Sequence, residues 1–239
     1  MNKEELILEL KKINLELTAF QLEQIEDFCQ LLLVENQKYN LTAIKTLDEI
    51  FLKHVYDSLT IIKAVDLNKH ANLLDIGSGG GFPGIILKIV FPHLNITLLD
   101  ANNKKTRFLN LAKEILKLDK LNIIQARAEV YVQNHREEFE IVVARAVAGL
   151  NVLMELAVPY VTEKGQFIAM KGNVQQELSL GQKACVFLNC QIASKIEFML
   201  PKENSRRTLL VIKKQGKTPE KYPRSYDKIL KNPLLIKEK

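Results

Sequence analysis

The chain has 239 residues and a formal net charge of +6; 47% of its residues are hydrophobic and 26% are charged, a balance typical of a soluble globular protein. This length is sufficient for one domain of ordinary core size with an appendage. No apolar run is long enough to cross a bilayer and no signal-peptide pattern opens the chain, so we expect a cytoplasmic protein with no membrane partner.

The N-terminal part of the chain is predicted to be helical. No glycine occurs before Gly77, and apolar residues recur at the three- and four-residue spacing of a helix face. Thr18 is a typical N-cap, because Gln21 follows three residues later. We therefore expect residues 1–66 to form a helical appendage. Its predicted helices cover residues 3–13, 18–37 and 46–65.

From residue 67 to residue 214, stretches typical of strands alternate with stretches typical of helices. This alternation predicts βαβ units and a parallel sheet, which is the α/β fold class. The last two predicted strands have no helix between them, so we expect an antiparallel hairpin at the end of the sheet. The predicted strands cover residues 72–76, 95–100, 121–126, 139–145, 165–171, 191–199 and 207–213, and the predicted helices cover residues 83–91, 102–117, 128–136, 147–159 and 173–187.

A glycine-rich loop follows the first predicted strand, with five glycines between Gly77 and Gly84. Glycine permits positive φ and close approach of a ligand to the main chain. The second predicted strand ends in Asp100, 23 residues after Gly77, close to the spacing at which an acidic residue binds a ribose hydroxyl pair. The pattern predicts a nucleoside-containing cofactor bound by Gly77, Gly79 and Asp100; a plain glycine-rich turn is the alternative.

The residues of this loop distinguish between nucleoside cofactors. A phosphate-binding loop counted from Gly79 to Gly84 is followed by isoleucines where lysine and serine or threonine are required. A dinucleotide loop needs a third glycine where Phe82 stands. Asp75, two residues before the first glycine, would suit the ammonium group of a methionine moiety. The loop and the terminal hairpin therefore favour S-adenosylmethionine.

Three further strand ends carry candidate site residues. Ala128 and Glu129 follow the third strand, where their backbone could pair with an adenine edge or simply begin a helix. Arg145 ends the fourth strand and could hold a carboxylate, a phosphate or a guanine edge. Lys171 ends the fifth strand and could meet RNA phosphate or have no partner.

Charge is unevenly distributed along the chain. Residues 1–60 carry 6 basic and 11 acidic residues, a net charge of −5, whereas residues 201–239 carry 12 basic and 4 acidic residues, a net charge of +8. A basic end of this density is either a phosphate-contacting surface or a solubilising, partly disordered tail. We set this tail at residues 215–239, and Arg207 and Arg224 are candidate RNA-binding residues with Lys171.

The chain lacks motifs that are typical of other methyltransferases, of zinc sites and of disulfide frameworks. The fourth strand is not followed by the Asn/Asp-Pro-Pro-Tyr/Phe motif of enzymes that methylate exocyclic amines, nor by the cysteine nucleophile of those that methylate C5 of pyrimidines. Cys185 and Cys190 would supply only half of a zinc site and no histidine lies near them in sequence, so we expect no metal. Three irregularly spaced cysteines also argue against a disulfide framework.

The motifs that the chain does contain resemble those of the bacterial small-subunit ribosomal RNA methyltransferase G family, also called glucose-inhibited division protein B. The resemblance extends over nearly the whole chain. The resemblance implies a Rossmann-like class I methyltransferase sheet with an N-terminal helical appendage. It also implies S-adenosylmethionine-dependent methylation of guanine N7 in 16S ribosomal RNA, with naked RNA or the small-subunit particle as substrate. The matching segments are residues 39–44, 54–59, 75–84, 99–100 with 104–105, 127–129, 144–146, 171–172 and 222–224.

By this resemblance, Gly77, Phe82, Ala128, Glu129 and Arg145 contact S-adenosylmethionine. The chain departs from the family at Ala101, where the family often has serine after the aspartate, which affects only a secondary contact. Guanine N7 carries an exposed lone pair and needs no general base, so catalysis can rest on alignment and electrostatics. We expect a monomer.

Three other functions compete with this one. The first alternative is a methyltransferase of the same fold that acts on a small molecule or a protein. A non-catalytic RNA-binding module with a decayed cofactor pocket and an NAD-dependent oxidoreductase are more distant.

Overall fold

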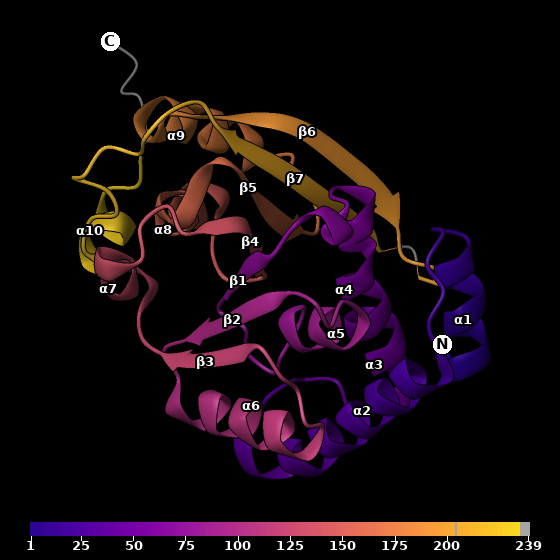
Figure 1. The fold of residues 1–239 in the computed structure, drawn as a ribbon. Helices are drawn as coiled ribbons and strands as arrows, with labels where there is room; N and C mark the ends of the chain where they lie inside the picture. The colour runs from indigo at the N-terminus through magenta and orange to yellow at the C-terminus, as the bar shows by residue number, and fades with distance from the viewer. Residues whose placement is uncertain (204, 235–239) are drawn as a thin grey trace.

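The structure, a computed structural model, describes residues 1–203 and 205–234. Seven strands form one sheet in the order β3-β2-β1-β4-β5-β7-β6 (Figure 1). Strands β1 to β5 are parallel, and β7 runs antiparallel to both β5 and β6. The predicted α/β class and the terminal hairpin are thereby confirmed. The strands are β1 (Asn72–Ile76), β2 (Asn95–Asp100), β3 (Leu121–Gln125), β4 (Phe139–Arg145), β5 (Val161–Lys171), β6 (Cys190–Met199) and β7 (Arg206–Lys214).

Helices cover both faces of the sheet (Figure 1). Leu73 of β1 belongs to a core shared with the N-terminal helices, α5 and α6, whereas its neighbour Leu74 belongs to a core shared with α8 and α9. This follows from the alternation of side chains along a strand. The helices are α1 (Lys3–Lys11), α2 (Ala19–Tyr39), α3 (Leu47–Ile50), α4 (Asp57–Leu59), α5 (Gly84–Val90), α6 (Asn103–Ile115), α7 (Ala128–Tyr131), α8 (Leu150–Ala157), α9 (Leu178–Leu188) and α10 (Tyr226–Lys231).

The segment predicted as one helix over residues 46–65 is divided into short pieces. Between α3 and α4 lies a π-helical turn, Phe51–Tyr56, and a 3₁₀ turn, Thr60–Lys63, follows α4. The Ser58 hydroxyl donates to the main-chain oxygen of His54 at 2.6 Å, and such side-chain bonds compete with regular helix hydrogen bonds. π-helical turns are common at functional sites, and this one carries His54.

Several predicted boundaries were wrong. The helix predicted over residues 128–136 ends at Tyr131 and is followed by a 3₁₀ turn, and the helix predicted over residues 147–159 begins at Leu150. β5 begins at Val161 rather than residue 165, because Gly165 is a point of close approach inside the strand: a Cβ there would lie 2.5 Å from the Glu140 oxygen. α9 begins at Leu178 rather than residue 173, because the Asn173 side chain accepts from the Gln175 amide and forms a turn.

The C-terminal segment that follows β7 packs back onto the sheet domain. The Arg136 guanidinium donates to the main-chain oxygens of Tyr222 at 2.6 Å and Thr218 at 3.0 Å. The side chain of Ile229 in α10 is fully buried. The last part of the predicted tail, residues 235–239, lies outside the described residues. Within the described residues, no helix combines the length and apolar character that crossing a membrane requires.

Candidate active site

The glycine loop between β1 and α5 is held against β2 by its main chain. Gly77 and Ser78 donate their amides to the Leu99 oxygen at 2.7 and 3.3 Å. Gly77 has φ +71°, and a Cβ at this position would lie 2.7 Å from a methyl carbon of Val147. Only glycine fits here without displacing that neighbour.

A cavity of about 360 Å³ opens beside this loop at the carboxyl ends of β1, β2, β3 and β4, and we call it the glycine-loop cavity. Four residues predicted to bind the cofactor line it: Gly77, Asp100, Ala128 and Glu129. Its volume lies in the range of small-molecule sites. The other residues of its wall are Ile76, Leu99, Ala101, Lys105, Ala126, Arg127, Ala146, Val147, Leu156 and Tyr226.

Asp100 connects β2 to the glycine loop. One carboxylate oxygen accepts from the Gly79 amide at 2.9 Å, and the other accepts from the Asn102 amide at 2.8 Å. A carboxylate has about four lone-pair sites, so acceptor capacity remains for a ribose hydroxyl pair. The glycine main chain, the Asp100 carboxylate and the apolar wall therefore fit the adenosine part of S-adenosylmethionine.

Asp75 lies behind this loop and does not line the glycine-loop cavity. Its Oδ2 atom accepts from the Gly84 amide at 2.9 Å, and its Oδ1 atom has no hydrogen-bond partner among the described residues. Burial raises the pKa of the Asp75 carboxyl to about 7. The side chain thus joins the loop to α5, and its predicted contact with an ammonium group stays a prediction.

Three other residues predicted to bind the cofactor lie outside the glycine-loop cavity wall. Gly79 gives its amide to Asp100. The Phe82 ring stacks on the His54 ring with centroids 4.4 Å apart, and the Arg145 guanidinium carbon lies 5.4 Å from the Phe82 ring centroid. Their cofactor contacts stay predictions.

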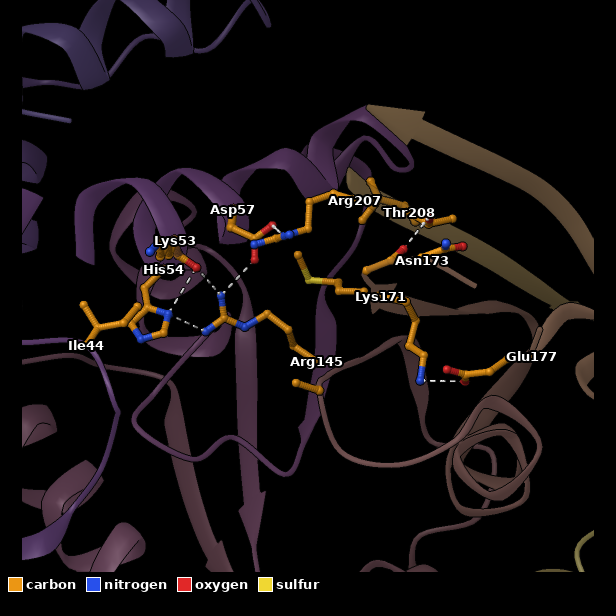
Figure 2. A pocket seen from close by; sticks show the side chains of 14 residues that line it. Ile44, Lys53, His54, Asp57, Arg145, Lys171, Asn173, Glu177, Arg207 and Thr208 are labelled. Carbon is orange, nitrogen blue, oxygen red and sulfur yellow. Dashed lines mark hydrogen bonds and ion pairs between the residues drawn. The ribbon is translucent and has the colours of Figure 1, made fainter. Parts of the chain in front are cut away.

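Figure 2 shows a second cavity, of about 470 Å³, which we call the arginine cavity. Ala146 lines both cavities, with its backbone in the left-handed region at φ +54°. A non-glycine residue at positive φ is uncommon and costs conformational energy. The arginine cavity contains four basic side chains and two carboxylates: Lys53, Arg145, Lys171, Arg207, Asp57 and Glu177.

The Asp57 carboxylate bridges two arginines from distant strands. Its Oδ2 atom lies 3.1 Å from Arg145 Nη1 of β4, and its Oδ1 atom lies 3.2 Å from Arg207 Nε of β7 (Figure 2). The Asp57 side chain is 8% exposed. Burial lowers the pKa of Arg145, and the Asp57 carboxylate opposes that shift. Asp57 thus ties the N-terminal block to both parts of the sheet.

Both ring nitrogens of His54 have hydrogen-bond partners. The Nδ1 atom lies 3.1 Å from Arg145 Nη2, which can only donate, and 3.1 Å from the Lys53 main-chain oxygen, which can only accept. The Nε2 atom lies 2.8 Å from the Thr42 hydroxyl, which can donate or accept. Burial, together with the positive charge of Arg145, lowers the pKa of His54 to about 3. At neutral pH this imidazole is uncharged and fixed.

The three candidate RNA-binding residues have protein partners. Arg207 pairs with Asp57, and Lys171 Nζ lies 2.8 Å from a Glu177 carboxylate oxygen. Arg224 lies away from the arginine cavity and forms a two-pronged ion pair with Glu155, at 2.8 and 2.7 Å. Their contacts with RNA stay predictions.

Sequence reasoning did not assign Lys53, His54 and Asp57 to the site. The spacing of His54 and Asp57 resembles that of any polar pair on one helix face, and only the tertiary structure shows that both side chains contact Arg145. The signal in the sequence was a histidine and an aspartate within an otherwise apolar helical stripe. Tyr226 of the C-terminal segment, in the wall of the glycine-loop cavity, was also missed.

The fold is that of class I methyltransferases. The chain is similar to a ribosomal protein L11 methylase from Lactobacillus delbrueckii subsp. bulgaricus, with a TM-score of 0.51, 16% identity, and coverage of 69% of this chain and 79% of that one. The chain is also similar to M. jannaschii TYW2 in complex with AdoMet, with a TM-score of 0.51 and 10% identity. This similarity covers 66% of this chain and 76% of that one.

The family follows from sequence. The family model for rRNA small subunit methyltransferase G matches residues 21–209, and the chain belongs to this family. Ribosomal RNA small subunit methyltransferase G of Bacillus licheniformis is 42% identical over 237 residues, covering 98% of this chain and 99% of that protein. The protein of the same name from Caldanaerobacter subterraneus is 44% identical, covering 93% of this chain and 94% of that protein. The resemblance found in the sequence is thus confirmed.

Proposed function

We propose that this chain transfers the methyl group of S-adenosylmethionine to N7 of a guanine in 16S ribosomal RNA. Family membership supports the general reaction, S-adenosylmethionine-dependent methylation of small-subunit ribosomal RNA. The observation that carries the proposal is the pair of cavities that meet at Ala146. One has the wall of a nucleoside site, and the other is rich in cations.

The chemistry needs little from the protein beyond alignment. Bound S-adenosylmethionine supplies an electrophilic methyl group on a sulfonium. Guanine N7 would donate its lone pair to that carbon while the carbon–sulfur bond breaks with its electron pair left on sulfur, so that S-adenosylhomocysteine leaves and no proton is lost. His54, held neutral between Thr42 and Arg145, is therefore not required as a base. Asp100 and Glu129, in the wall of the glycine-loop cavity, would hold and orient the adenosine moiety.

The arginine cavity is suited to a nucleotide of an RNA chain. Lys53 and Arg207 have side chains that are 30% and 22% exposed, so both are accessible to phosphate. Asp57 offsets part of the cationic charge, which would otherwise oppose formation of the positively charged 7-methylguanine. We also propose that the protein acts as a monomer in the cytoplasm, on naked 16S RNA or on the small-subunit particle.

The test is methylation in vitro. The protein is incubated with methyl-labelled S-adenosylmethionine and either unmodified 16S RNA or small-subunit particles, and reduction followed by aniline cleavage locates any 7-methylguanine. We expect label at a single guanine N7. Label at an exocyclic amine, or on protein alone, would replace the proposal with another methyltransferase activity.

A further inference from the structure

The C-terminal segment supplies part of the wall of the glycine-loop cavity. Tyr226, the first residue of α10, lines this cavity together with Arg127, Ala128 and Leu156. Figure 1 shows α10, in yellow, beside α7 and α8. The family model ends at residue 209, so Tyr226 lies outside the stretch that defines the family.

Two anchors hold Tyr226 in place. Two residues before it, Arg224 donates its main-chain amide at 3.0 Å and its guanidinium at 2.8 and 2.7 Å to the carboxylate of Glu155, which is fully buried in α8. Three residues after it, Ile229 is fully buried against Val152 and Leu156. The main chain that carries Tyr226 is thus anchored on both sides of this residue.

The surroundings of the ring suit a flat heterocycle. The Arg127 guanidinium carbon lies over the Tyr226 ring, 5.5 Å from its centroid, and the cavity wall includes the apolar residues Leu99, Ala126 and Leu156. Aromatic rings stack on purine bases, and the affinity gained does not depend on hydrogen bonding by the aromatic residue.

We propose that Tyr226 stacks on the adenine of S-adenosylmethionine, so that the C-terminal segment completes the cofactor site. This inference rests on the proposed function, since it assumes that the glycine-loop cavity holds the cofactor. It also gives Arg224 a role other than RNA contact. By pairing with Glu155, Arg224 positions the segment that carries the adenine-binding ring.

The test compares two substitutions that both remove the hydroxyl group. Tyr226→Phe keeps the ring and Tyr226→Leu removes it, while Leu230→Ala changes a half-exposed residue of the same helix as a control. Calorimetric titration with S-adenosylhomocysteine should give about tenfold weaker binding for Tyr226→Leu. The other two variants should bind like the unchanged protein. Methylthioadenosine, which keeps the adenine but lacks the amino-acid part, should show the same loss.

A second readout reports on the ring itself. The chain has no tryptophan and six tyrosines, so its intrinsic fluorescence comes from tyrosine. Stacking on adenine should quench part of this signal in the unchanged protein, and Tyr226→Phe should lose that part while binding equally well. Because this readout compares the unchanged protein with Tyr226→Phe, it tests the stacking of Tyr226 on adenine even if circular dichroism shows that Tyr226→Leu is unfolded.

The outcomes separate the two proposals. If the unchanged protein does not bind S-adenosylhomocysteine, the proposed function fails and this inference fails with it. If the unchanged protein binds and the folded Tyr226→Leu variant binds equally well, only the role of Tyr226 is overturned. Quenching that is identical in the unchanged protein and Tyr226→Phe would overturn it as well.

Discussion

The two cavities that meet at Ala146 are built in different ways. The glycine-loop cavity is formed largely by main chain and by residues next to strand ends, such as Gly77 and Asp100. The arginine cavity is formed by charged side chains from three remote segments, which the Asp57 carboxylate joins through Arg145 and Arg207. The first depends on local backbone geometry and the second on tertiary structure, so substitutions should affect the two cavities separately.

The largest effect is expected from Gly77→Val. The new side chain would collide with Val147, since even a Cβ would lie 2.7 Å from it, and valine is disfavoured at φ +71°. Calorimetry should detect no binding of S-adenosylhomocysteine. Gly216→Val is the matched control, because a Cβ at Gly216 meets nothing within 4 Å. Normal cofactor affinity in Gly77→Val would show that the loop does not contact the ligand.

Asp57→Asn should damage the arginine cavity alone. Removing this charge leaves Arg145 and Arg207 without their shared partner, which should cost roughly 3 kcal/mol of unfolding free energy. Misplaced arginines should lower kcat/KM for RNA methylation by about a hundredfold. Affinity for S-adenosylhomocysteine should not change. Asp48→Asn, at a side chain that is 66% exposed, is the control. Loss of cofactor affinity in Asp57→Asn would mean that the two cavities are one energetic unit.

Asp100→Ala tests the side-chain part of the glycine-loop cavity. It removes the acceptor for the Gly79 and Asn102 amides and for the ribose hydroxyls. Cofactor binding should weaken by about 1–3 kcal/mol, measured by calorimetry. RNA binding measured without cofactor should be unaffected. Unchanged cofactor affinity would place the ribose elsewhere.

The contrast between the cavities also explains what the sequence could predict. Gly77, Asp100, Ala128 and Glu129, which line the glycine-loop cavity, were predicted because each lies at or shortly after the carboxyl end of a strand, and these ends meet at one edge of a parallel sheet. The parallel sheet and its terminal antiparallel hairpin were predicted from the same alternation of strands and helices. Such features need only local pattern and the rules of sheet topology.

Side-chain partners across long separations could not be predicted in this way. Arg224 was assigned to RNA because it lies in a basic tail, yet it pairs with Glu155, 69 residues away. Arg145 was expected at the cofactor, a contact that stays a prediction, and its packing against Asp57 and Phe82 was not foreseen. Which carboxylate neutralises which arginine depends on tertiary packing, and no spacing in a single sequence records it.

The pH dependence of stability tests the buried imidazole of the arginine cavity. Between pH 6.5 and about 3, the unfolded chain binds a proton that native His54 does not, so stability falls as pH falls. The His54→Gln variant has no titrating group at this position and lacks this contribution to the pH dependence of stability. Relative to the variant, the unchanged protein should therefore lose roughly 1.4 kcal/mol per pH unit below 6.5.

Denaturant unfolding of both proteins between pH 7 and pH 4.5 measures this difference. Asp75 acts in the opposite direction: with its pKa raised to about 7, it adds stability as pH falls from 7 toward 3.8. Both proteins keep Asp75, so its contribution cancels. Parallel pH profiles would show that native His54 titrates normally and that Arg145 does not hold it neutral.

The smallest expected effect is the difference between charge reversals at the two ends of β7. This strand runs from the edge of the arginine cavity, where Thr208 pairs with Lys171, to the opposite edge, where Lys213 pairs with Gln166. The basic C-terminal region is therefore not one surface. Lys214 is buried against Glu137, whereas Lys213 is exposed but lies far along the strand from the cavity.

Arg206→Glu and Lys213→Glu make the same charge reversal at these two ends. Arg206 precedes Arg207 of the arginine cavity in β7, and its half-exposed side chain lies 3.7 Å from a Glu197 carboxylate oxygen. Its reversal should weaken RNA binding and reduce the slope of log affinity against log salt by about 1. Lys213→Glu should change neither. Equal losses in both variants would mean that RNA is held by overall charge. A loss confined to Arg206→Glu would mean that the arginine-cavity edge of the sheet is where the RNA backbone lies, next to the side chains that the sequence did not reveal.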